Sequence, residues 1–190
     1  MAAFTAKTRL EAATIGHALN ALLPQDVAVR AVRQVPPEFD PRRWARRRQY
    51  RYTIATGEAR DPLARRYAWY LEGTLDLPAM QHLAPAFTGR RNYSAFAGKL
   101  EPGRSPLRTV FTSGVHRTGE RLHIEIEADA FLPQMVRRIV AALVRVGRHA
   151  TTEEEIVSLL EQARPGAFTH LAPAHGLCLE RVWYDEGYTP

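Results

Sequence analysis

The stretch from residue 121 to residue 147 constrains the fold most strongly, because a strand pattern passes directly into a helix pattern there. From Leu122 to Ala128, apolar residues alternate with polar and charged ones, the period of a strand with one buried and one wet face. From Met135, apolar residues recur at spacings of three and four until Gly147 supplies a stop. The stretch therefore predicts a half-buried strand followed by a mostly buried helix.

Arg137 is the residue of this helix that most needs an explanation. It stands among apolar neighbours, and an unpaired charge in an apolar core is prohibitively costly. The sequence therefore predicts an anionic partner for Arg137. One interpretation is an ordinary core arginine that pairs with Glu125 or Glu127 of the preceding strand.

The rest of the chain supplies further patterns. A capping box at Thr8 to Glu11 predicts a helix that ends at Pro24, and residues 2–4 look like the tail of a strand. Further strands are predicted at residues 26–32, 50–55, 67–71, 107–115 and 176–184, and further helices at 76–89, with a kink at Pro85, and at 152–165. Residues 92–106 predict a long surface loop. Together these elements predict an α+β fold with an antiparallel-rich sheet and helices packed on one face.

Composition excludes several classes of protein. A hydrophobic fraction of 45% over 190 residues is enough for a real core. The sequence has no apolar run near the roughly 20 residues that cross a bilayer, so we expect a cytoplasmic protein with no membrane contact. The single cysteine and the spacing of the seven histidines argue against disulfide scaffolds and metal sites.

Basic and aromatic residues gather between positions 42 and 52, in a chain of net charge +6. The cluster comprises Arg42, Arg43, Arg46, Arg47, Arg48 and Arg51, interleaved with Trp44, Tyr50 and Tyr52. This mixture suits contacts to phosphates together with stacking on bases. The alternative is a solvated loop that happens to be basic.

Three segments in order along the chain carry a resemblance: LNALLPQDVAVRAV, FDPRRWARRRQYRYTI, and ADAFLPQMVRRIVAALVRVG with the closing AHGLCLERVWY. Together they resemble the bacterial tRNA pseudouridine synthase A family over nearly the whole chain. The resemblance implies a pseudouridine synthase-like fold and the isomerisation of uridine to pseudouridine in the anticodon stem-loop of tRNA. It also implies that the enzyme uses no cofactor and is a homodimer. The target base must leave its stack for such chemistry.

The resemblance assigns roles to particular residues. Tyr50 corresponds to the active-site tyrosine that packs against the target base and takes its carbon proton. Arg137 matches the arginine that pairs with the catalytic aspartate. Arg42 falls where the family has a tRNA-contacting arginine. We expect Arg48 and Arg51 of the basic cluster to bind the substrate tRNA as well, together with Tyr50. The alternative for Tyr50 is a half-buried cross-strand aromatic with a purely structural role.

The family's nucleophilic aspartate lies in a Gly-Arg-Thr-Asp-Ala-Gly-Val-His segment that does not occur here. We therefore expect an N-terminally truncated form, with residues 1–36 as a remnant of an N-terminal RNA-binding and catalytic subdomain and residues 37–190 as the C-terminal subdomain. Asp129 is the aspartate closest in sequence to the Arg137 helix, and it is a weak candidate for the missing nucleophile. The alternatives to a synthase are a catalytically silent tRNA-binding module and a non-functional fragment.

Overall fold

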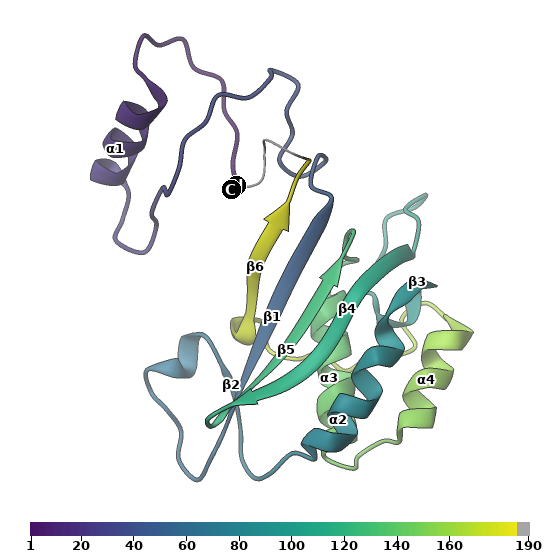
Figure 1. Ribbon diagram of the computed structural model, residues 1–190. Helices are drawn as coiled ribbons and strands as arrows, with labels where there is room; N and C mark the ends of the chain where they lie inside the picture. Colours follow the sequence, from purple (N-terminus) through teal and green to yellow (C-terminus); the bar gives the residue numbers. More distant parts are fainter. Residues whose placement is uncertain (186–190) are drawn as a thin grey trace. The chain divides into compact units, whose positions relative to one another are not determined.

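The computed structural model describes residues 1–185, which form two compact units (Figure 1). One unit comprises residues 1–45 and 183–185, and the other comprises residues 46–182. The division expected from the sequence at residues 36 and 37 remains a prediction. No helix within residues 1–185 is both long enough and apolar enough to span a bilayer.

The first unit contains one helix, α1 (Ala12–Leu22), none of whose residues is buried. The capping box predicted at its start is wrong: the Thr8 hydroxyl accepts the Leu10 N–H, and the helix begins only after Glu11. The strands predicted at residues 2–4 and 26–32 are also wrong. The main chain of Val29 is hydrogen-bonded instead to the Asn20 side-chain amide, at 2.7 and 2.9 Å. This side chain takes the place of a partner strand.

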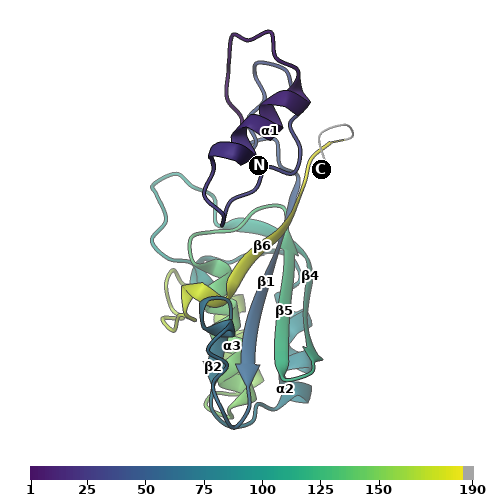
Figure 2. The ribbon, with the colours of Figure 1, turned by 90° about the vertical axis from the view of Figure 1, so that its left-hand side faces the viewer.

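The second unit is built on a six-stranded sheet, and it confirms the predicted α+β class. The strands are β1 (Arg47–Thr56), β2 (Trp69–Leu71), β3 (Gly89–Asn92), β4 (Leu107–Thr118), β5 (Arg121–Ala128) and β6 (Leu177–Trp183). Their order is β2-β1-β5-β4-β3, and β6 also pairs with β1. The β1–β2 pair is parallel, whereas β1–β5, β4–β5 and β3–β4 are antiparallel. Figure 2 shows β6, β1, β5 and β4 side by side.

Three helices lie beside this sheet: α2 (Leu77–Leu83), α3 (Met135–Gly147) and α4 (Glu153–Gln162) (Figure 1). The helix predicted at 76–89 passes into a 3₁₀ turn at Ala84–Phe87, as Pro85 requires. The capping box that begins α4 is confirmed. The predicted surface loop 92–106 is wrong at its start, because residues 93–97 are buried. Strand β3 was not predicted.

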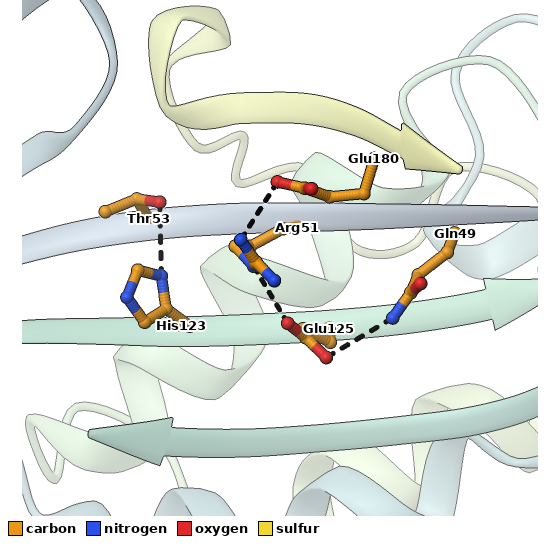
Figure 3. Close-up of polar contacts among 6 residues, drawn as sticks. All are labelled: Gln49, Arg51, Thr53, His123, Glu125 and Glu180. Carbon is orange, nitrogen blue, oxygen red and sulfur yellow. Dashed lines mark hydrogen bonds and ion pairs between the residues drawn. The ribbon is translucent and has the colours of Figure 1, made fainter. Parts of the chain in front are cut away.

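The two faces of the sheet differ sharply. Side chains such as Tyr52, Ile54 and Ile124 are fully buried in one core with α3. The alternating residues form a polar layer on the other face (Figure 3). There Arg51 pairs with Glu125 at 2.8 Å and with Glu180 at 3.1 Å. One side of β1 therefore faces the helices, and the other carries an internally paired set of charges.

Candidate active site

A cavity of about 160 Å³ lies where β1, the turn before α3, the first turn of α3 and the start of β6 meet. Its lining consists of Tyr50, Phe131, Leu132, Gln134, Met135, Val136, Arg137 and Leu177. Two residues that the sequence singled out, Tyr50 and Arg137, thus line the same cavity although 87 positions separate them in the chain. The strand places Tyr50 there and the first turn of the helix places Arg137.

Tyr50 forms an aromatic wall of this cavity. It is half-buried on β1, opposite Ile126 of β5. Its ring meets the Phe131 ring edge to face, with 5.1 Å between the centroids and 87° between the planes. Within residues 1–185 the Tyr50 hydroxyl makes no hydrogen bond. An aromatic ring with a free hydroxyl can pack against a flat ligand and still exchange a proton with it.

The guanidinium group of Arg137 is hydrogen-bonded through Nε, whereas its two terminal nitrogens are available to a ligand. Its Nε donates to the Ala172 carbonyl at 2.7 Å, and the Ala172 N–H donates back to the Arg137 carbonyl at 3.2 Å. The two terminal nitrogens of the guanidinium have no hydrogen-bond or ion-pair partner among the described residues. A guanidinium held in this way can present two parallel N–H donors to a carboxylate.

The interpretation of Arg137 as a core arginine paired with the preceding strand is wrong. Glu125 bonds to Arg51 and Gln49 (Figure 3). Glu127 bonds to Arg47 at 3.1 Å. Both glutamates lie on the polar face of β5, because they alternate with the buried residues of that strand. The sheet itself therefore separates them from the α3 side.

A short segment, residues 172–176, connects Arg137 to the sheet through hydrogen bonds and close packing. The Tyr52 hydroxyl donates to the Pro173 carbonyl at 2.8 Å, directly after the Ala172 carbonyl that holds the guanidinium. Gly176 lies so close to the Tyr52 ring that a methyl group in its place would meet ring carbons at 2.7 Å. Burial raises the pKa of Tyr52 well above its ordinary value, although the nearby Arg137 charge opposes this shift. The hydroxyl therefore stays protonated and available as a donor.

Arg48 shares the helix-facing side of β1 with Tyr50, two residues away, and its Nη1 donates to the Asp129 carbonyl at 2.6 Å. The Asp129 carboxylate accepts the N–H groups of Thr109 and Ala130, at 3.1 and 2.6 Å. Asp129 does not line the cavity. Its contacts fix the ends of β4 and β5, and nothing in its position supports a role as a replacement nucleophile.

The two other predicted substrate-binding arginines are not among the residues that line the cavity. Arg51 is on the opposite face of the sheet, where it pairs with Glu125 and Glu180 (Figure 3). Arg42 belongs to the other compact unit, where its exposed backbone N–H donates to the Asp40 carboxylate at 2.8 Å. The structure thus brings together Tyr50 and Arg137, with Arg48 on the same side of β1.

The sequence reasoning did not assign the other six lining residues to the site: Phe131, Leu132, Gln134, Met135, Val136 and Leu177. The apolar pair Phe131–Leu132 interrupts the strand alternation just before the helix, which was the available signal. Gln134 is a polar residue beside the apolar pattern of α3, which by itself indicates no particular role. No group of three or more histidine, cysteine or acidic side chains that could hold a metal ion occurs within residues 1–185.

Comparison with known proteins adds a finding independent of this geometry. The pattern of the family described as tRNA pseudouridine synthase matches residues 83–185. The tRNA pseudouridine synthase A of Geotalea uraniireducens is 36% identical over 184 residues, which cover 97% of this chain and 75% of that protein. The protein of the same name from Geobacter sulfurreducens is 37% identical, covering 96% and 75%, and that from Thermotoga neapolitana is 36% identical, covering 93% and 72%. This chain belongs to the tRNA pseudouridine synthase family, a family of isomerases.

Proposed function

We propose that the cavity lined by Tyr50 and Arg137 is the place where a uridine of the tRNA anticodon stem-loop becomes pseudouridine. In this isomerisation the bond from N1 of the base to C1′ of the ribose breaks, and a bond from C5 to C1′ forms. C5 loses a proton and N1 gains one, so no cofactor is needed. The observation that carries the proposal is the shared cavity of these two residues in a member of this family.

Each residue has a role that suits its surroundings. The Tyr50 ring, braced by Phe131, packs against the extruded base, and its free hydroxyl takes the proton from C5. Arg137 holds the carboxylate of the nucleophile through the terminal nitrogens that have no partner in the described part of the chain. This role supplies the anionic partner that the sequence predicts for Arg137.

A second candidate function rests on a specific observation. The 190 residues contain no Gly-Arg-Thr-Asp segment, and no carboxylate lines the described cavity. A chain that never receives a carboxylate at Arg137 would act as a catalytically silent tRNA-binding module. The two functions differ in turnover and agree in tRNA binding.

The net charge of +6 and the cluster around Arg42 and Arg48 support tRNA as the partner of either form. In this proposal Arg42 and Arg48 contact phosphates of the tRNA. The protein acts in the cytoplasm as a homodimer. Arg51, already paired with two glutamates, stabilises the sheet instead. Affinity for tRNA should fall steeply as salt rises from 50 to 200 mM, roughly tenfold or more if two or three phosphates are contacted. Affinity that does not change with salt would contradict these contacts.

The activity is tested on protein expressed from its own chromosomal gene, with tRNA that carries tritium at C5 of uridine. Formation of the C5–C1′ bond releases this tritium to water. We expect Tyr50→Phe to lower the release rate by about 100-fold or more, the usual loss for a general acid or base. Arg137→Gln should cause a loss of the same order, because it removes the charge that orients the nucleophile.

Matched controls come from the same chain. Tyr67→Phe alters a tyrosine that is 74% exposed, and Arg145→Gln alters an arginine near the far end of α3. Both should retain wild-type rates. If the wild type releases no tritium but binds tRNA, the silent binding module is the correct function. If Tyr50→Phe and Arg137→Gln behave like their controls, the cavity is not the active site.

A further inference from the structure

Gln134 has a backbone conformation that is uncommon for a non-glycine residue. It immediately precedes α3 with a φ of 61°, in the left-handed region, and its side chain makes no capping hydrogen bond to the helix. Two other non-glycine residues within residues 1–185 have positive φ, His149 and Ala163, and both follow helix C-termini, where this conformation is ordinary. A left-handed non-glycine residue is energetically unfavourable, and such residues cluster at functional sites.

The Gln134 side chain has a fixed orientation. Nη2 of Arg138 donates to Oε1 of Gln134 at 3.2 Å, and Nη1 of Arg138 donates to the Phe168 carbonyl. Because a guanidinium only donates hydrogen bonds, the atom that faces it must be the amide oxygen. The amide nitrogen therefore points away from Arg138, and its two hydrogens have no partner among the described residues.

Gly98 makes room for this arrangement. A methyl group on Gly98 would lie 3.0 Å from Oε1 and 3.1 Å from Cδ of Gln134, tighter than most real contacts. The Gly98 N–H donates to the Pro133 carbonyl at 2.8 Å, which draws the loop against the residue before Gln134. The Arg138 side chain and the Gly98 backbone thus flank Gln134, an exposed residue that lines the same cavity as Tyr50 and Arg137.

We propose that Gln134 recognises uracil in this cavity, its amide N–H donating a hydrogen bond to a carbonyl oxygen of the base. The inference rests on the proposed function and adds a residue that recognises the base by a hydrogen bond. It explains why a left-handed conformation, an oriented amide and a side-chain-free position at residue 98 occur together. Uracil offers two carbonyl oxygens, O2 and O4, and the experiment distinguishes them.

The test measures tritium release from three tRNAs that differ only in the target nucleotide. This nucleotide is ordinary uridine in the first, uridine with sulfur in place of O2 in the second, and uridine with sulfur in place of O4 in the third. Sulfur accepts hydrogen bonds poorly, so the wild type should be slowed by one of the two sulfur substitutions. Gln134→Ala removes the donor and should lower kcat/KM for the ordinary uridine by about 3- to 10-fold, as expected for one neutral hydrogen bond. It should also abolish the difference between that sulfur-substituted tRNA and the ordinary one.

Two further variants separate recognition from structural support. Gln134→Glu keeps an oxygen for Arg138 and loses the donor, so its kcat/KM should fall as in Gln134→Ala. Gln134→Gly relieves the left-handed backbone, so its melting temperature should equal or exceed that of the wild type although its activity falls. Gln162→Ala, at an exposed position of α4, serves as the control and should change neither quantity.

The inference is wrong if Gln134→Ala has wild-type kcat/KM, or if it remains as sensitive to the same sulfur substitution as the wild type. It is also wrong if Gln134→Gly loses activity only in proportion to a lowered melting temperature. A wild type without any turnover would refute the proposed function, and the inference with it. Turnover by the wild type with unaffected Gln134 variants would refute the inference alone.

Discussion

Replacing Gly176 by alanine tests how closely residues 172–176, which hold the Arg137 side chain, are packed against the sheet. A Cβ at this position would lie 2.7 Å from two carbons of the Tyr52 ring and 2.9 Å from the Thr53 carbonyl oxygen. Distances under 3.0 Å cannot persist, and the fully buried Tyr52 ring has little free space into which it could move. We expect residues 174–176, the Tyr52 ring, or both to shift.

The magnitude follows from the cost of overpacking. Adding one methyl group to a well-packed core costs about 1–3 kcal/mol of unfolding free energy. For a chain of this length each kcal/mol lowers the melting temperature by about 2–4 °C, so Gly176→Ala should melt roughly 2–12 °C below the wild type. Thermal unfolding followed by circular dichroism measures this shift.

Gly114→Ala provides the matched control. A Cβ on Gly114 would meet nothing within 4 Å, and Gly114 also lies in an ordinary strand, β4. Its melting temperature should stay the same or rise slightly, because alanine loses less backbone entropy on folding than glycine. If Gly176→Ala melted like Gly114→Ala, residues 172–176 would not be packed against Tyr52 as described, and the support proposed for Arg137 would be wrong.

Three further predictions concern stability. Tyr52→Phe leaves the Pro173 carbonyl without its donor and should cost about 1 kcal/mol in urea unfolding; an unchanged midpoint would contradict the hydrogen bond. The Glu153 carboxylate lies 2.6 Å from Nδ1 of His82 and raises the pKa of this histidine. The pair therefore stabilises the fold fully at pH values below the pKa of His82 in the unfolded chain, about 6.5. This stabilisation is lost as the pH rises through the higher pKa of His82 in the folded chain. His82→Gln should therefore be destabilising at pH 5.5 and nearly neutral at pH 8.5; an equal effect at both would refute the ion pair. Ala163→Gly, at the left-handed end of α4, should raise stability by about 0.5–1 kcal/mol, and a loss would show that this end is not strained.

The central strand and helix could be predicted from the sequence because burial imposes its own period on each of them. Residues 122–128 alternate and residues 135–147 recur at helical spacing, and the structure buries both against each other. The two predicted capping boxes show that a local motif alone does not determine where a helix begins. Thr152 and Glu155 form both reciprocal bonds, whereas the same motif at Thr8 lies ahead of a helix that buries nothing.

Elements that depend on a partner were harder to predict. Residues 26–32 alternate like a strand but have no strand partner within the described residues, and Asn20 holds their main chain instead. Residues 89–92 have no apolar alternation, because β3 is held at the sheet edge only by its pairing with β4. Local pattern therefore predicted a strand that is absent and missed one that is present.

The candidate site was only partly accessible from the sequence. The need of Arg137 for a partner could be deduced from its apolar neighbours, but its proximity to Tyr50 depends on the pairing of β1 with β5 and on the position of α3. The exclusion of Glu125 as a partner of Arg137 follows from the face of β5 on which it lies. The left-handed backbone of Gln134 leaves no mark in the sequence, since glutamine is not a residue that favours it.

The most direct test of the central claim is a map of pseudouridine in the tRNA of the organism's own cells, with the chromosomal gene either intact or carrying Arg137→Gln. The account predicts that pseudouridine in the anticodon stem-loop is present with the intact gene and lost in the variant, while pseudouridine elsewhere in tRNA is unchanged. An anticodon stem-loop with the same pseudouridine content in both strains would contradict the assignment of this cavity as the active site.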